Sequence, residues 1–147
     1  GVGCGELIAI AMSKWYDISI NDARKKVLFL DSKGMVCASR INSLQEHKKA
    51  FAHDVPFEPD LLSAVRTFKP NILIGVSTVR GAFSADVIKE MAASNDRPII
   101  FPLSNPTSKS ECTFEEAFHG TEGRVLFASG SPFPPLESTT GTFYPAQ

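Results

Sequence analysis

The side chains best suited to chemistry in this sequence follow short apolar runs. Asp31 closes the run that begins at Lys26, and Ser32 and Lys33 come directly after it. A carboxylate at the end of a strand can accept two hydrogen bonds from a ribose, and its charge repels a 2′-phosphate. The hydroxyl of Ser32 and the cation of Lys33 could instead tolerate a 2′-phosphate. The alternative is an ordinary turn with a solvated aspartate and lysine before Gly34.

Two later strings also place polar groups after apolar runs. Val76 and Ser77 end the run 71–76 and present backbone amides and a hydroxyl. Asn105 follows the run that starts at Pro98, and its planar amide offers donors and an acceptor that suit a carboxamide or a carboxylate. A tight turn after Val76 and an Asn-Pro turn at Asn105 are the alternatives. The string 129–133 follows a fourth run and could line the same crevice.

The glycines at the start invite comparison with the dinucleotide fingerprint. Gly1, Gly3 and Gly5 are closely spaced, but the fingerprint needs a preceding strand, and no residue precedes Gly1 in this sequence. The acidic residue should also lie ~20 positions beyond the glycines. Asp31 lies thirty positions beyond Gly1, which suits a fingerprint whose front is missing.

The positions of these residues depend on alternating strands and helices. Apolar runs predict four strands, at 26–31, 71–76, 98–103 and 124–128. Helical spacing predicts helices over 6–16, 43–53, 61–68, 84–91 and 113–118. This alternation predicts an α/β fold, a doubly wound and mostly parallel sheet with helices on both faces. Thr113 and Glu116 have the spacing of a capping box, and the tail after Ser131 predicts no regular element.

Composition narrows the class of protein. The 147 residues suit one domain, and 43% hydrophobic with 21% charged residues indicates a globular chain. A formal net charge of −1 argues against a nucleic-acid partner, and no run approaches the ~18 apolar residues of a membrane span. Three cysteines without metal-ligand spacing indicate a reducing compartment, and Cys112 is expected to be a small buried residue.

The strings named above, read together, resemble the cofactor domain of malic enzymes over essentially the whole chain. The resemblance is carried by residues 27–34, 97–101, 103–113 and 127–133. It implies a Rossmann-type NAD(P)-binding domain in an enzyme that oxidatively decarboxylates malate to pyruvate and CO₂. It also implies NAD or NADP, a divalent metal (Mg²⁺ or Mn²⁺), and a homo-oligomer, either a dimer or a tetramer.

The resemblance assigns roles to individual residues. Asp31 is similar to the carboxylate that contacts the adenine ribose, and Ser32 lies where NADP-using members often have a small polar residue. Val76 and Ser77 resemble the loop beside the cofactor. Asn105 resembles the asparagine that contacts the nicotinamide and the substrate carboxylate. We favour NADP over NAD, on Ser32 and on the basic stretch 47–49.

The same resemblance places other functional residues outside this sequence. Gly1 matches the last small residue of the fingerprint, so Gly1 and Gly3 are assigned to cofactor binding. The catalytic tyrosine and lysine and the metal-binding acids of the family lie upstream, so no catalytic or metal-binding residue is expected within 1–147. We therefore expect one NAD(P)-binding domain, incomplete at both ends and lacking its first strand, that does not turn over malate alone.

Two alternatives and the compartment stay open at this point. A non-catalytic nucleotide-binding module would also have a parallel sheet, and an amino-acid dehydrogenase would have a similar cofactor domain. The string 104–107, Ser-Asn-Pro-Thr, speaks against the dehydrogenase. The compartment could be the cytoplasm, the mitochondrion or a plastid.

Overall fold

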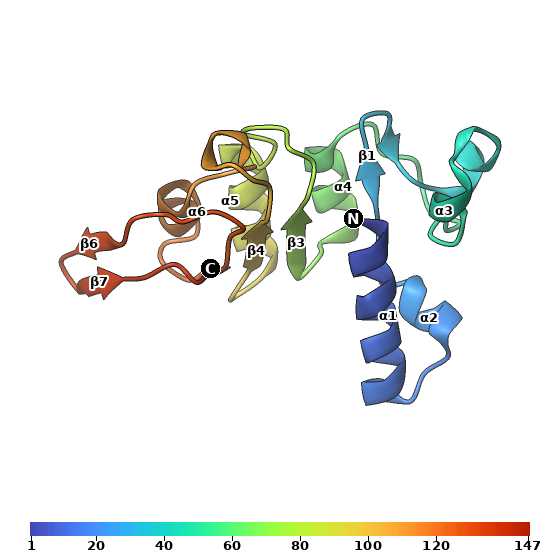
Figure 1. Cartoon of the computed structure of the whole chain (residues 1–147), viewed down its shortest axis with the longest axis horizontal. Coiled ribbons are helices and arrows are strands. Elements are labelled where there is room, and N and C mark those ends of the chain that lie inside the picture. The colour runs from blue at the N-terminus through green and yellow to red at the C-terminus, as the bar shows by residue number, and fades with distance from the viewer. The chain divides into compact units, whose positions relative to one another are not determined.

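A computed structural model describes all 147 residues, which form two compact units. Unit 1 comprises Gly1–Asp60 and unit 2 comprises Leu61–Gln147. Figure 1 shows the helices and strands of both units, coloured along the chain. No helix has the length and apolar character that a membrane crossing requires.

Unit 1 begins with two packed helices, α1 (Val2–Tyr16) and α2 (Ile20–Arg24). The Arg24 guanidinium donates two hydrogen bonds to the Glu6 carboxylate, at 3.0 Å from Nε and 2.5 Å from Nη2. Ser19 caps α2 by accepting a hydrogen bond from the Asp22 amide. The expected helix over 6–16 is therefore present and extends back to Val2.

The rest of unit 1 consists of short elements around a small apolar core. These elements are β1 (Leu30–Asp31), β2 (Gly34–Met35), a 3₁₀ helix (Ala38–Ser43) and α3 (Glu46–Lys49). Phe51 is buried, and its ring meets that of Phe29 edge-on with the centroids 4.8 Å apart. The single helix expected over 43–53 is wrong in extent, because the 3₁₀ helix ends at Ser43 and only the single turn of α3 lies within this region.

The prediction of a buried parallel strand over 26–31 is also wrong. Only Leu30 and Asp31 are in a strand, and they pair antiparallel with Met35 and Gly34 of the same hairpin. An apolar run becomes a parallel strand only when a strand of the same direction lies beside it, and the strand beside β1 is β2, which runs antiparallel. The run instead ends in a tight hairpin that places Asp31 at a turn.

Unit 2 contains a three-stranded parallel sheet in the order β3, β4, β5 (Figure 1). Its strands are β3 (Ile72–Gly75), β4 (Ile99–Pro102) and β5 (Leu126–Phe127), and its helices are α4 (Leu61–Phe68), α5 (Ala85–Ser94) and α6 (Phe114–Gly120), with a 3₁₀ turn at Thr107–Lys109. The prediction of an α/β fold with a parallel sheet is confirmed.

The core of unit 2 lies between one face of this sheet and the three helices. Leu73, Ile100 and Phe127 are register partners on neighbouring strands, so their side chains share one face. They pack with Ile88 of α5 and Phe114 of α6 in one buried cluster. Burial of such a cluster is the main stabilising contribution to a small domain.

The arrangement of α5 and α6 on the same face follows from the strand order. Each helix connects one strand to the next parallel strand in the same direction across the sheet, and such crossovers are right-handed. Helices on both faces require the strand order to reverse, and it does not reverse among β3, β4 and β5. On the opposite face Ile72 remains 49% exposed.

The tail contains a hairpin that the sequence did not predict. β6 (Leu136–Ser138) pairs antiparallel with β7 (Gly141–Phe143), and Gly141 has a φ of 138° at the turn. Phe143 packs on Phe118 of α6 with ring centroids 4.7 Å apart. The three prolines before β6 prevent helix formation there but leave room for a short hairpin anchored by one aromatic contact.

The N-terminus of α6 has the capping box that the sequence predicted. The Glu116 amide donates to Thr113 Oγ1 at 3.1 Å, and the Thr113 amide donates to Glu116 Oε2 at 2.7 Å. These two hydrogen bonds satisfy amides that the helix itself leaves unpaired.

We expect Thr113→Ala to lower the free energy of unfolding of the chain by about 1 kcal/mol, because the cap acceptor is lost. Urea denaturation followed by circular dichroism measures the change. Thr113→Ser, which keeps the hydroxyl, is the matched control and should stay near the wild type. Equal stability of the alanine and serine variants would contradict the role of the cap.

Candidate functional site

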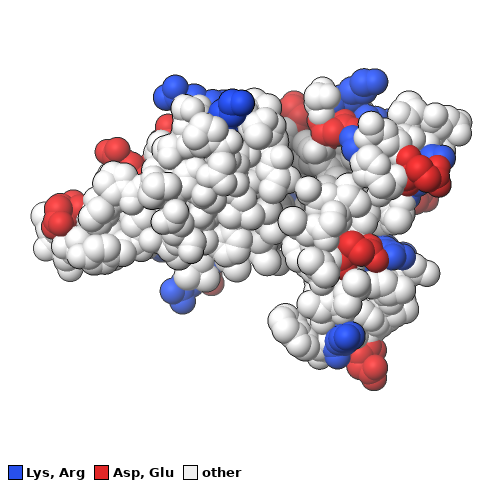
Figure 2. All heavy atoms as spheres, in the orientation of Figure 1, with Lys and Arg blue, Asp and Glu red and all other residues white.

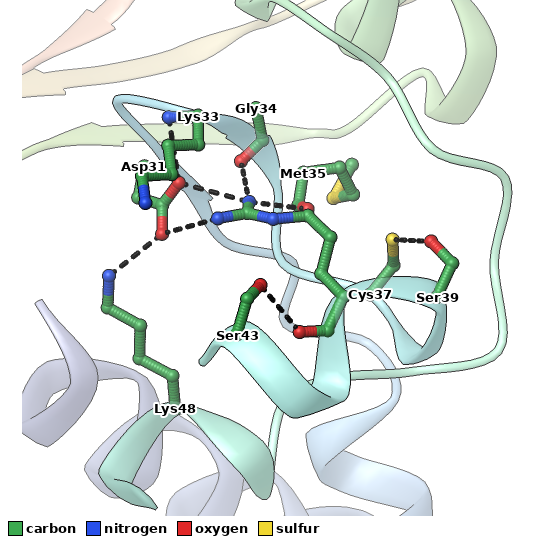
Figure 3. Close-up of polar contacts among 9 residues, drawn as sticks. Asp31, Lys33, Gly34, Met35, Cys37, Ser39, Ser43 and Lys48 are labelled. Carbon is green, nitrogen blue, oxygen red and sulfur yellow. Dashed lines mark hydrogen bonds and ion pairs between the residues drawn. The ribbon is translucent and has the colours of Figure 1, made fainter. Parts of the chain in front are cut away.

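Asp31 of unit 1 is the centre of a cluster of cations (Figure 3). Its Oδ1 accepts a hydrogen bond from the Lys33 amide at 2.9 Å and pairs with Arg40 Nη1 at 3.0 Å. Its Oδ2 accepts from Arg40 Nη2 at 3.2 Å and from Lys48 Nζ at 2.8 Å. Each carboxylate oxygen therefore has two donors, which fills its acceptor capacity.

The Asp31 cluster favours the ionised carboxylate. Partial burial alone raises the pKa of Asp31, but hydrogen bonds from Arg40, Lys48 and the Lys33 amide outweigh it and hold that pKa well below its usual range. The side chains of Asp31, Arg40 and Lys48 are 20%, 13% and 24% exposed. These ion pairs are thus partly shielded from water, and salt screens them less than fully exposed pairs.

The hairpin turn explains how neighbouring residues place Asp31. Asp31 accepts from the amide two residues on, which is an Asx turn. Gly34 follows with a φ of 98°, and a Cβ there would lie 2.6 Å from the Glu58 carbonyl oxygen. Only glycine fits this conformation and this space. Arg40 also donates to the carbonyl oxygens of Gly34 and Met35, both at 2.9 Å.

The cluster has a positive balance at the turn. Arg40 and Lys48 bring two cationic side chains against the single carboxylate of Asp31, which Lys33 contacts through its backbone amide. Ser32 is exposed at the tip of the turn, and its hydroxyl forms no hydrogen bond within the chain. Such a group of cations with a free hydroxyl can bind a phosphate, with Lys and Arg supplying charge-assisted donors.

The glycines at the start occupy the first turn of α1. Gly1 is the N-cap residue, and its carbonyl accepts from the Gly5 amide at 3.0 Å. A Cβ at Gly3 would meet nothing within 4 Å, whereas one at Gly5 would collide with the Phe29 ring. A side chain at position 5, to which the sequence assigned no role, would thus displace the Phe29 ring, whereas position 3 is free of crowding.

In unit 2, the loop after β3 is tied to a buried carboxylate. Val76 is 45% exposed, while Ser77 donates to Glu111 Oε1 from its amide at 2.8 Å and from its hydroxyl at 2.9 Å. Thr78 has a φ of 58°, a conformation that costs energy for a β-branched residue. The Thr78 amide donates to Ser104 Oγ at 2.9 Å, which holds this conformation.

The loop after β4 carries Asn105 at the surface. Asn105 Oδ1 accepts a hydrogen bond from Ser131 Oγ at 2.6 Å, and Ser131 belongs to the loop after β5. Its Nδ2 donates to no group of the chain. A Cβ at Gly130 would lie 2.3 Å from the Leu103 carbonyl oxygen and 3.0 Å from that Nδ2, so only glycine fits between the Leu103 backbone and the amide. Asn105 therefore offers two N–H donors to a carbonyl or a carboxylate outside the chain.

Cys112 behaves as a small buried residue, as predicted. It is 2% exposed, and burial, followed by the charges of Glu116 and Glu111, raises the pKa of its thiol to about 12. It borders a cavity of about 300 Å³, also lined by Arg80 and Thr107, that includes none of the predicted site residues. A thiol with this pKa is protonated at neutral pH and is a poor nucleophile.

The acidic and thiol side chains do not assemble a metal site. No group of three or more His, Cys, Asp or Glu side chains lies close enough to hold a metal ion. The residues of this chain therefore do not fit the divalent metal that the resemblance implies. On the face shown in Figure 2, Lys and Arg side chains are interspersed with Asp and Glu rather than gathered in a single-sign patch.

The sequence did not predict the residues that hold Asp31 and Ser77 in place. Arg40 and Lys48 lie 9 and 17 positions from Asp31, and Glu111 lies 34 positions from Ser77. No local spacing signals such pairs. The basic stretch 47–49 was the one usable sign, and the structure brings Lys48 of that stretch to Asp31.

Comparisons with known proteins give the relationships of the chain. The family model described as "Malic enzyme, NAD binding domain" matches residues 1–147. The chain is 52% identical over its whole length to the NADP-dependent malic enzyme of Vitis vinifera and 49% identical to the chloroplastic NADP-dependent malic enzyme 4 of Arabidopsis thaliana. It covers 25% and 23% of those proteins, so it spans about a quarter of the relatives it matches.

We expect Asp31→Asn to lower the free energy of unfolding at pH 7 by roughly 1–3 kcal/mol, because Arg40 and Lys48 lose a charged acceptor. A carboxylate whose pKa is lowered by folding stabilises the protein above its unfolded pKa of ~3.9 and loses that effect as the pH falls. The difference between wild type and variant should thus be constant from about pH 7 to 5 and shrink below about pH 4.

Denaturant unfolding of both proteins across this pH range measures the effect. Asp54→Asn is the control, because Asp54 is exposed and lies outside the cluster. A stability difference that persists unchanged down to about pH 3 would contradict the ion pairs of Asp31.

Proposed function

The chain belongs to the malic enzyme NAD-binding domain family, and we propose that it is the NAD(P)-binding part of an enzyme that oxidatively decarboxylates malate. The family match over residues 1–147 is the observation that carries this proposal. Relatives named NADP-dependent malic enzymes, about 50% identical to the chain, support it. Because the chain spans about a quarter of these relatives, we assign the activity to a longer protein with residues 1–147 as one cofactor domain.

Asn105 is the residue we assign to the reacting end of the cofactor. When bound, NAD(P)⁺ accepts a hydride from C2 of malate. Ser131 holds Asn105 Oδ1, and the two Nδ2 donors that this leaves unused would bind a nicotinamide carboxamide or a malate carboxylate. Holding a donor in place before the substrate binds lowers the entropic cost of reaching the reactive geometry. Val76 and Ser77, on the loop after β3, are assigned to the same end of the cofactor.

The Asp31 cluster is assigned to the adenosine end, with a preference for NADP. A free carboxylate at this position would accept the ribose hydroxyls and repel a 2′-phosphate. Arg40 and Lys48 already neutralise Asp31 and occupy its acceptor sites. Asp31 then acts by holding these cations, whose remaining donors, with the hydroxyl of Ser32, bind the 2′-phosphate.

The pyrophosphate of the cofactor and the divalent metal need binding groups other than Asn105 and the Asp31 cluster. We assign the pyrophosphate to the amides of the first turn of α1, beginning at Gly1 and Gly3, because helix N-termini favour anions. A divalent metal would take its ligands from other parts of the whole protein, and no step assigned to this chain involves it. The homo-oligomer (dimer or tetramer) stays a prediction from the resemblance, and the compartment stays open among the cytoplasm, the mitochondrion and a plastid.

The direct test compares the 147-residue chain with the full-length protein that contains it. With malate, NADP⁺ and Mg²⁺ or Mn²⁺, we expect the full-length protein to form NADPH, measured by absorbance at about 340 nm. The chain alone should form none, because the catalytic tyrosine and lysine that the family resemblance implies lie outside residues 1–147. NADPH formation by the chain alone would contradict the proposal that the catalytic residues lie outside it. If the full-length protein formed no NADPH, a non-catalytic nucleotide-binding module would be favoured.

Lys48→Gln tests the cofactor preference in the full-length protein. Loss of the Nζ cation should raise the KM for NADP⁺ by about tenfold or more, because a charge-assisted contact to the 2′-phosphate is lost, while the KM for NAD⁺ changes little. Lys49→Gln is the matched control, since Lys49 pairs with Glu46 instead of Asp31. Equal effects of Lys48→Gln on the two cofactors would overturn the NADP assignment.

A further inference from the structure

Glu111 is a fully buried carboxylate whose hydrogen bonds all converge on one oxygen. It is 0% exposed, and its Oε1 accepts from the Ser77 amide, the Ser77 hydroxyl and the Ser104 hydroxyl at 2.8, 2.9 and 2.6 Å. Its Oε2 has no hydrogen-bond partner. Burial alone raises the pKa of Glu111, but these hydrogen bonds outweigh it and hold that pKa below its usual value.

The chain makes room for this carboxylate at the end of the sheet. Gly75 is the last residue of β3 and pairs in register with Pro102, the last residue of β4. A Cβ on Gly75 would lie 2.5 Å from Glu111 Cδ and 2.7 Å from its Oε2. The carboxylate thus sits against the backbone at the strand end, where any side chain on residue 75 would displace it.

The hydrogen bonds of Glu111 join two loops that carry assigned cofactor residues. Ser104 Oγ donates to Glu111 and accepts from the Thr78 amide at 2.9 Å, so it connects the loop after β4 to the loop after β3. Asn105 is the next residue in the chain. On its other side Asn105 is held by Ser131, which is 2% exposed. Movement of Ser104 would therefore move Asn105 against Ser131.

We propose that Glu111 is a positioning residue for hydride transfer: its Oε1 holds the loops after β3 and β4 in the arrangement in which Asn105 presents Nδ2 to the nicotinamide or the substrate. The inference rests on the function proposed above, because that function supplies the ligand of Asn105. Glu111 is buried and reaches the ligand only through Ser77 and Ser104.

Two substitutions separate the hydrogen-bond acceptor at Oε1 from the negative charge of Glu111. Glutamine keeps an oxygen at the same distance from the backbone and can accept from the same three donors. Aspartate keeps the charge but is one methylene shorter, so its oxygens cannot reach Ser77 and Ser104 together. A positioning role therefore predicts that Glu111→Gln retains activity better than Glu111→Asp, and an electrostatic role predicts the reverse.

The test uses the full-length protein and three variants, Glu111→Gln, Glu111→Asp and the control Glu115→Gln. Glu115 is exposed and forms no hydrogen bond within the chain. We expect Glu111→Asp to lower kcat about tenfold to 100-fold, because small displacements of reacting groups are costly. Glu111→Gln should stay within about threefold of the wild type, since neutral hydrogen bonds are weaker than charge-assisted ones but keep their geometry. The control should be unchanged.

Binding of adenosine 2′,5′-bisphosphate separates positioning from a general structural role. This probe carries the adenosine 2′-phosphate but no nicotinamide, so its Kd should be unchanged in all variants while kcat falls in Glu111→Asp. If Glu111→Asp fails to fold, Ser104→Ala removes only the connecting hydroxyl and should lower kcat in the same direction with the Kd retained.

Three outcomes would overturn the proposal. These are full activity of Glu111→Asp and Ser104→Ala, greater activity of Glu111→Asp than of Glu111→Gln, or a parallel loss of kcat and of adenosine 2′,5′-bisphosphate binding. A wild-type protein that does not reduce NADP⁺ with malate would refute the proposed function itself, and this result is distinct because it does not depend on any variant.

Discussion

Three donors converge on one buried oxygen, Glu111 Oε1, and the loops at the carboxyl end of the sheet in unit 2 depend on this arrangement. It requires glycine at position 75, because a side chain there would collide with the carboxylate. It also requires a hydroxyl at Ser104, which relays the contact to the Thr78 amide and helps to hold Thr78 in a left-handed conformation. A buried ionised group is tolerated only when it is hydrogen-bonded, so these residue choices depend on one another.

The two organising carboxylates of the chain use opposite electrostatic solutions. Asp31 is partly exposed and is satisfied by cations from Arg40 and Lys48, which leave a positive surplus at the turn. Glu111 is buried, and its Oε1 accepts from neutral hydroxyl and amide donors, so no cation is buried with it. The first arrangement suits a site that must attract an anion from water. The second suits a fixed support, because hydrogen-bond geometry in a dry interior resists displacement more than a salt bridge at the surface.

Local patterns predicted the elements whose signals are contained within a few residues. The capping box at Thr113 and Glu116 is present, and β4 begins directly after Pro98 and ends at Pro102, close to the expected bounds. The apolar run at 26–31 failed as a parallel strand, because periodicity reports what a segment could bury and says nothing of a neighbouring strand. Helical spacing correctly predicted α1, but Trp15 of that helix is 81% exposed. The spacing shows which side chains share a face and does not show whether another element covers that face.

The positions of Asp31, Ser77 and Asn105 at strand or turn ends could be predicted, because polar residues after apolar runs mark them. The partner of Ser77 could not be predicted. Glu111 directly precedes a capping box, so its sequence context is that of a surface acid at a helix start. Its burial depends on two residues far away in the sequence: Gly75, which leaves space, and Ser77, which supplies two donors. The burial of Glu111 therefore depends on a missing side chain at position 75. This relationship becomes visible only when β3 and the loop that carries Glu111 are seen together.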